Sequence, residues 1–152
     1  LICKANDQYP GKIFTSSKSV KIKIDADIIS RDSIDMIEII KNGKVYKTIP
    51  GDQLSNGKYH DEISFDQSGW FLARVLCKTP GNFRFASTAP FHVRIKGKKY
   101  ISKSSAQFFL DLINQRATLI KIDDPKEAAI VTGYIDTARQ FWQHLVNTAT
   151  AE

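Results

Sequence analysis

Apolar and polar side chains alternate along most of the first hundred residues of the chain. Between residues 20 and 28, an apolar residue occupies every second position, and lysine or aspartate fills the positions between. This period of two is typical of a strand with one buried face. The same pattern predicts seven or so short strands, at residues 11–15, 20–28, 34–49 (a hairpin), 59–65, 69–77, 90–95 and 98–101.

The hairpin carries the most specific short-range signal in the chain. Asn42 and Gly43 separate two strand-like segments within residues 34–49. Asparagine and glycine supply the two positive φ angles of a type I′ turn, which joins antiparallel strands. We therefore expect two strands joined by a two-residue turn.

Residues 69–77, GWFLARVLC, are apolar in both alternating registers except at Arg74. Such a strand is expected to be buried on both faces and to need a second cover besides the opposite sheet. An arginine in that setting cannot lose its proton, and an unpaired buried charge costs several kcal/mol. We expect Arg74 to pair with a carboxylate, with Glu38 as the first choice, or with carbonyl oxygens at the end of the sandwich.

The turn into this strand, Asp66 to Trp70, has the spacing of the corner that opens strand F in immunoglobulin-like domains, with Trp70 in place of the usual tyrosine. A buried indole needs a partner for its N–H group, and a backbone carbonyl across the corner could accept that hydrogen bond. The alternative for Trp70 is a platform on which a sugar stacks.

After Tyr100 the apolar period changes from 2 to 3.6, which predicts a helix over residues 102–122. Asp124 as N-cap, Pro125 at the first helical position and Glu127 three residues after the cap then start a second helix, to about Thr148. Two amphipathic helices need a third surface for their apolar stripes, and the strand at 69–77 offers one.

These elements predict a mostly β fold with added α structure. We expect an immunoglobulin-like antiparallel β-sandwich of about seven strands over residues 1–101. A helical hairpin over residues 102–152 should pack on the sandwich and form part of the same globular unit.

Composition narrows the range of partners. The 152 residues include 22 Lys and Arg against 16 Asp and Glu, a formal net charge of +6. Local enrichment occurs at residues 18–23 and 94–103, but only Tyr100 lies among these cations, whereas nucleic-acid sites interleave several stacking aromatics. The pattern therefore favours a lysine-rich sheet edge over a phosphate site and predicts no nucleic-acid partner.

No segment is long and apolar enough to predict a membrane span.

The search for reactive groups gives no complete active site. His60, His92 and His144 are far apart in sequence and form no metal-binding motif, and Ser16, Ser17 and Ser19 lack a nearby base. The acids at residues 25, 27 and 32 lack the glycine and terminal glutamate of a calcium loop. Cys3 and Cys77 permit one disulfide without establishing it, and a buried free thiol is the favoured state of Cys77.

Four segments in order, IDMIEIIKNGKVYKTI, GWFLARVLC, FRFASTAPFHVRIKGKKY and SSAQFFLDLINQR, resemble the C-terminal region of CehA/McbA-type metallohydrolases, relatives of the PHP phosphoesterases. The resemblance covers roughly residues 20–145. The family often has histidine where this chain has Ser87. The matching positions are Glu38, Asn42, Gly43, Trp70, Ala73, Arg74, Ala86, Thr88 and Pro90.

The resemblance implies a non-catalytic accessory domain whose partner is an upstream catalytic domain of the same polypeptide. The divalent metal and its His and Asp ligands belong to that domain, so no catalytic, cofactor-binding or metal-binding residue is expected here. Five residues are structural or interface candidates: Glu38, Trp70, Arg74, Thr88 and Pro90. Arg74 and Thr88 are structural residues or else contribute to the rim of the neighbouring active site.

Two other functions stay open. The first is a module that binds a ligand such as carbohydrate, which a row of exposed aromatics including Tyr46 and Tyr59 would favour. The second is a self-contained enzyme, which the lack of a nucleophile with a base disfavours.

A periplasmic or secreted bacterial location is favoured over a cytoplasmic one.

Overall fold

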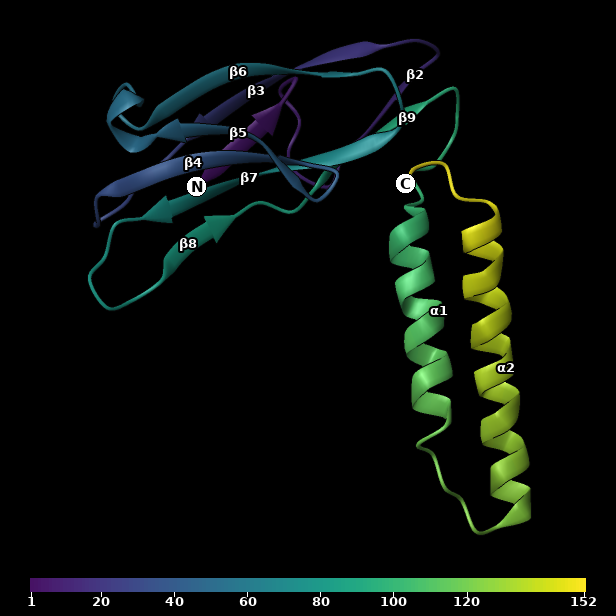
Figure 1. Ribbon diagram of the computed structural model, residues 1–152. Helices are drawn as coiled ribbons and strands as arrows, with labels where there is room; N and C mark the ends of the chain where they lie inside the picture. Colours follow the sequence, from purple (N-terminus) through teal and green to yellow (C-terminus); the bar gives the residue numbers. More distant parts are fainter. The chain divides into compact units, whose positions relative to one another are not determined.

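The computed structural model describes all 152 residues, which form two compact units, Leu1–Lys99 and Tyr100–Glu152 (Figure 1). The first unit contains all nine strands and the second contains both helices. The predicted boundary, between residues 101 and 102, lies two residues away. The packing of the helices on the sandwich stays a prediction.

The first unit is a sandwich of a small antiparallel sheet and a large mixed sheet, which confirms the predicted mostly β fold class. The small sheet has the order β1-β3-β6, from Ile2–Ala5, Val20–Asp27 and Lys58–Phe65. The large sheet has the order β2-β9-β7-β4-β5, with β8 also paired to β7, and only β2 and β9 are parallel. Its strands are β2 (Ile13–Ser16), β4 (Ile34–Lys41), β5 (Lys44–Pro50), β7 (Gly69–Cys77), β8 (Arg84–Ser87) and β9 (Phe91–Ile95).

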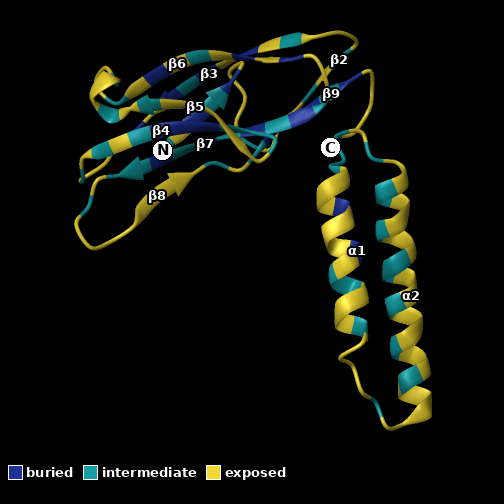
Figure 2. Cartoon of the chain, viewed as in Figure 1, coloured by how far each residue is buried: buried dark blue, intermediate teal, exposed yellow.

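The core lies between the two sheets, where the inward residues of each strand meet (Figure 2). Its largest fully buried side chains include Phe65, Phe71 and Phe91, and the rings of Phe71 and Phe91 stack with centroids 5.0 Å apart. Burying each such side chain contributes about 1.5 to 3 kcal/mol. The aromatic cluster therefore joins the last strand of the small sheet to the centre of the large one.

Strand β7 covers the predicted range, but its two faces differ in burial. Phe71, Ala73 and Val75 belong to the core and are almost fully buried, whereas the alternate residues, among them Leu72 and Leu76, are only half-buried. The prediction of a strand buried on both faces is therefore right for the inner face and wrong for the outer one.

The Asn42-Gly43 turn is confirmed, because φ is 52° at Asn42 and 84° at Gly43. Two strands were missed, β1 and β8. Each has only four residues, ICKA in β1 and RFAS in β8, which are too few to give a clear alternating pattern in the sequence. The strand predicted at 98–101 is wrong, since Lys96 and Gly97 both adopt positive φ and turn the chain after β9.

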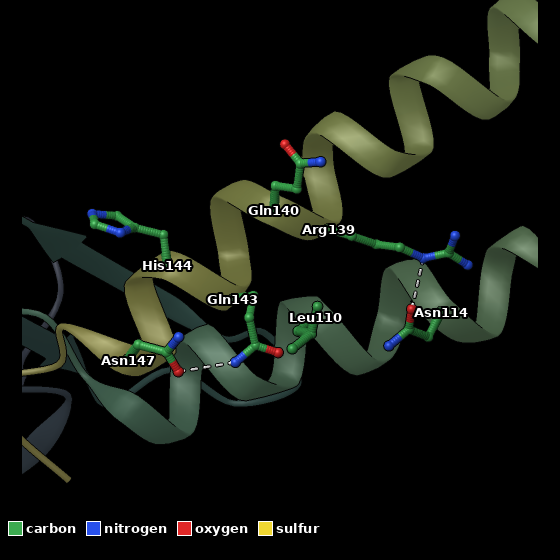
Figure 3. Close-up of a pocket in the computed structure, with 7 residues that line it drawn as sticks. All are labelled: Leu110, Asn114, Arg139, Gln140, Gln143, His144 and Asn147. Atoms are coloured by element: carbon green, nitrogen blue, oxygen red, sulfur yellow. Dashed lines mark hydrogen bonds between the residues drawn. The ribbon is translucent and has the colours of Figure 1, made fainter.

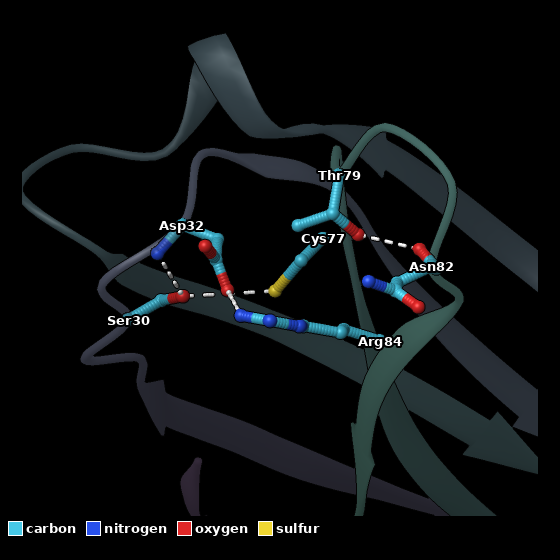
Figure 4. A network of polar contacts seen from close by, with 6 residues as sticks. All are labelled: Ser30, Asp32, Cys77, Thr79, Asn82 and Arg84. Carbon is cyan, nitrogen blue, oxygen red and sulfur yellow. Dashed lines mark hydrogen bonds and ion pairs between the residues drawn. The ribbon is translucent and has the colours of Figure 1, made fainter.

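The loops that follow β3 and β7 are held together by polar contacts (Figure 4). Arg84 forms an ion pair with Asp32 at 2.7 Å, and the Ser30 hydroxyl lies 3.6 Å from the Cys77 sulfur. The Thr79 hydroxyl donates a hydrogen bond to a backbone carbonyl across the β7–β8 loop. These contacts fix the two loops at one end of the sandwich.

The second unit is a pair of helices, α1 (Lys103–Ala117) and α2 (Pro125–Asn147), which lie side by side (Figure 1). The start of α2 follows the predicted capping, because the Asp124 carboxylate accepts hydrogen bonds from the backbone N–H groups of residues 126 and 127. The cap of α1 was not predicted: the Ser102 hydroxyl accepts a hydrogen bond from the backbone N–H of residue 105. The first helix ends at Ala117 rather than near 122. Only Ala106 and Leu110 are buried in this unit.

Candidate interaction surface

The outer face of the large sheet carries most of the residues singled out from the sequence. Because side chains alternate along a strand, the half-buried residues of β7 point away from the core. The register places Glu38 of β4 opposite Arg74 of β7, with apolar neighbours on either side along both strands. The members of this outer face are Met36, Glu38 and Ile40 on β4, Trp70, Leu72, Arg74 and Leu76 on β7, and Phe85 and Ser87 on β8.

The ion pair predicted between Arg74 and Glu38 is present at the centre of this face. Nε and Nη2 of Arg74 lie 2.9 and 2.6 Å from the same oxygen, Oε2 of Glu38. The Glu38 side chain is 11% exposed and that of Arg74 is 35% exposed. A carboxylate covered to this extent is costly without its partner, so the pair fixes both side chains where β4 and β7 meet.

Thr88 and Pro90 form the step that separates β8 from β9. The Thr88 N–H donates to the Ala73 carbonyl at 3.0 Å, and its hydroxyl accepts from the Ala73 N–H at 3.2 Å. Pro90 has no N–H to give to a sheet, and its carbonyl accepts from Gly11 at 2.9 Å. Thr88 thus keeps β7 hydrogen-bonded where regular pairing stops.

Trp70 makes a corner contact, but through its backbone. Its N–H donates to Oδ1 of Asn42 at 2.9 Å, and the Asn42 N–H donates to the Trp70 carbonyl at 3.0 Å. The expected bond from the indole N–H to a backbone carbonyl is absent. The side chain is half-buried beside Gly43, so the indole does not need a protein partner for its N–H group.

A second polar cluster closes one edge of the sandwich between β5 and β6. Asp61 accepts hydrogen bonds from the Lys47 ammonium and the Tyr59 hydroxyl. Partial burial acts to raise the pKa of Asp61, but these hydrogen bonds and the Lys47 charge outweigh it and lower that pKa below its usual value. Burial is the larger cause that raises the pKa of Tyr59, and the hydrogen bond to Asp61 raises it further.

A sugar-binding module would present a row of exposed aromatic side chains, for which Tyr46 and Tyr59 were the candidates. Tyr59 is only 6% exposed and faces the core, whereas Tyr46 is 51% exposed. Tyr59 therefore cannot form a stacking surface with Tyr46.

The potentially reactive side chains are dispersed. Cys3 and Cys77 are both free, and burial, assisted by the charge of Asp25, raises the pKa of Cys3 to about 11. Cys77 was expected to be buried but is half-exposed at the end of β7. His60 lies 2.6 Å from Asp25, and no three His, Cys, Asp or Glu side chains lie close enough together to hold a metal ion.

The helical unit has a depression of about 520 Å³ along one side of the hairpin (Figure 3). Its polar groups largely bond to one another: Nε of Arg139 donates to Asn114 at 2.9 Å, and the Gln143 amide donates to Asn147 at 3.1 Å. These contacts join α1 to α2 and span one turn of α2. Leu110, Gln140 and His144 complete the lining.

Comparisons with known proteins identify no family. No protein-family model and no curated protein matches the chain. Among solved structures, the chain is similar to the fibronectin(III)-like modules of CbhA from Clostridium thermocellum, with 12% sequence identity and a TM-score of 0.40. The match covers 62% of this chain and 46% of that one, so the chain spans about half the length of that structure.

Neither helix is long and apolar enough to cross a membrane.

Proposed function

We propose that the chain is a non-catalytic accessory module of a larger metal-dependent hydrolase. In this proposal, the outer face of the large sheet packs against the catalytic domain of the same polypeptide. The observation that carries the proposal is the apolar character of that face around the Arg74–Glu38 pair. The module needs no cofactor, and the divalent metal belongs to the catalytic domain.

The composition of the outer face supports this role. Half-buried aliphatic residues of β4 and β7 surround the ion pair, and Phe85, which is 57% exposed, extends the patch onto β8. Continuous apolar patches on a domain surface mark places where another surface binds, whereas scattered apolar residues do not. An apolar patch with one paired charge at its centre suits a contact between domains of one chain.

The resemblance to CehA/McbA-type metallohydrolases supports the identity of the partner. The residues that carry it include Trp70, Arg74 and Thr88, which lie on the outer face or directly beside it. With Tyr59 buried, no observed row of aromatics favours the alternative, a carbohydrate-binding module acting through such a row.

The test compares this chain alone with the longer polypeptide that includes its upstream residues. Phe85→Ser should leave the melting temperature of the isolated chain nearly unchanged, because the side chain is already largely exposed. In the longer polypeptide it should lower both the melting temperature and the metal-dependent hydrolase activity. Tyr9→Ser is the matched control, since Tyr9 is 63% exposed and lies outside the outer face.

Two results would contradict the proposal. The first is equal behaviour of the Phe85 and Tyr9 variants in the longer polypeptide, which would remove the outer face as the contact. The second is a stoichiometric transition metal retained by this chain after dialysis, which would place metal chemistry in the module itself.

A further inference from the structure

One end of the sandwich gathers lysines that are far apart in the sequence. They come from the β2–β3 turn, from the residues that flank the β4–β5 turn and from the turn after β9, and hydrogen bonds join the first and last of these turns to each other and to the β6–β7 loop. The Lys96 N–H donates to the Ser16 carbonyl at 2.8 Å, and the Ser68 hydroxyl donates to the Lys98 carbonyl at 2.8 Å. The lysines of this basic end are Lys18, Lys41, Lys44, Lys96 and Lys98.

The opposite end of the sandwich has no such excess of charge. Its loops, at residues 28–33, 51–57 and 78–83, together with the strand residues that flank them, contain four cations, Arg31, Lys58, Lys78 and Arg84, and three acids, Asp27, Asp32 and Asp52. At the basic end, Asp66 is the acid that lines the same surface as the lysines. The positive charge of the sandwich is therefore polarised toward one end, although the sequence suggests only scattered enrichment.

The basic end includes an open groove of about 860 Å³. Lys41 is held inside it, because its Nζ donates to the Ser64 carbonyl at 2.7 Å and lies 4.4 Å from the centre of the Phe65 ring. The half-exposed ring of Tyr46 lies 5.2 Å from the same ammonium group. The groove is lined by Ser16, Lys18, Ser19, Val20, Lys21, Lys41, Tyr46, Ser64, Phe65 and Asp66.

The turn after β9 departs from ordinary turn chemistry. Lys96 has a φ of 53°, in the left-handed region that asparagine, aspartate and glycine adopt more readily. By contrast, the equivalent position of the β4–β5 turn holds Asn42, the expected residue type. A residue that breaks a local rule without a packing gain points to a functional requirement at that position, here for a positive charge.

We propose that the groove and the surrounding lysines bind an anionic oligosaccharide, a sugar chain that carries carboxylate or sulfate groups. The lysines are spread over three turns, which suits a ligand with charges spaced along its length better than a single small anion. Three serines line the groove beside Tyr46, so polar groups and an aromatic ring are available to a sugar. A single-stranded nucleic acid would need several rings on which successive bases stack, and Tyr46 is the only exposed ring in the groove.

This inference uses none of the residues of the outer face, so it can fail independently of the proposed function. The test is calorimetric titration of the chain with a heparin-derived hexasaccharide and, separately, with hexagalacturonate, at 0.15 M NaCl. Maltohexaose serves as the neutral probe. We expect one or both anionic probes to bind, more weakly as salt is raised, and maltohexaose not to bind.

Matched variants separate the site from the overall charge. Lys18→Gln/Lys44→Gln/Lys96→Gln should weaken binding about tenfold, because three exposed ion contacts with the ligand are lost together. The control, at the opposite end, is a triple variant that removes the same charge and should bind like the unmodified chain. The control carries Arg31→Gln, Lys58→Gln and Lys78→Gln.

Substitutions of Tyr46 test whether the bound ligand is a sugar that contacts the aromatic ring. Tyr46→Ala should weaken binding severalfold, and Tyr46→Phe should restore it if the ring is the contact. The proposal is overturned if neither anionic probe binds or if the control triple variant loses as much affinity as the triple variant at the basic end. It is also overturned if Tyr46→Ala has no effect while single-stranded DNA binds as tightly, because the site would then recognise any polyanion.

Discussion

Replacing Arg74 with methionine should destabilise the sandwich without disturbing its shape. Methionine keeps much of the packing volume on the outer face but removes both nitrogen atoms that contact Glu38. The Glu38 carboxylate, only 11% exposed, then loses its only ion-pair partner. Breaking a fully buried pair costs about 3 to 5 kcal/mol. Because the Arg74 side chain is 35% exposed, we expect a smaller loss, about 2 kcal/mol.

The assay is urea unfolding followed by the fluorescence of Trp70, in a Trp142→Phe background so that the signal reports on the sandwich alone. A loss of about 2 kcal/mol should lower the midpoint by roughly 1 to 2 M urea. In thermal unfolding it corresponds to a decrease of about 8 to 16 °C for a unit of this size.

The double variant Arg74→Met/Glu38→Leu is the control, because it removes the unpaired charge together with its partner. We expect it to regain most of the lost stability, as replacing both members of a covered ion pair with apolar residues is often neutral. A single variant within about 0.5 kcal/mol of the parent would refute this reasoning, and so would a double variant no more stable than Arg74→Met.

Three further predictions concern separate parts of the sandwich. Hydrogen bonds lower the pKa of Asp61 in the folded state, so its carboxylate contributes stability that is present above about pH 4 and lost as pH falls below it. In acid titration, Lys47→Met should therefore lose less folding stability than the parent chain. A thiol reagent should label Cys77 rapidly in the native protein and Cys3 only on unfolding, because burial raises the pKa of Cys3 and blocks access; equal rates would contradict this. Gly69→Ala should lower the melting temperature by several degrees, since a Cβ there would lie 2.5 Å from a side-chain oxygen of the β4–β5 turn; an unchanged value would show that this turn can move.

Strong local signals made several elements predictable from the sequence. The Asn42-Gly43 turn, the Asp124 cap and the limits of β7 depend on residues adjacent in the chain, whose chemistry has few alternatives. The Arg74–Glu38 pair was also predictable, because an arginine in an apolar strand has to find an acid on a neighbouring one.

Other features depend on contacts that a single strand does not reveal. The exposed strand β8 forms because the β7–β8 hairpin brings it alongside β7, not because its own four residues favour pairing. The two faces of β7 carry similar side chains but differ in burial, since only one of them meets the small sheet. The basic end could not be foreseen because its lysines come from three separate turns that meet only in the folded sandwich.

The parallel pairing of β2 and β9 gives the sandwich a mechanical property. The chain enters the large sheet through β2 and leaves the sandwich after β9, and Ile95 at the end of β9 lies opposite Ser16. Tension applied between the start of β2 and the end of β9 would therefore draw these two strands past each other in shear. Their backbone bonds, such as those from Gly11 to Pro90 and from His92 to Lys12, would share the load at once instead of opening one after another. Pulled in this direction, the sandwich should therefore resist extension more than it would if the same bonds opened one by one.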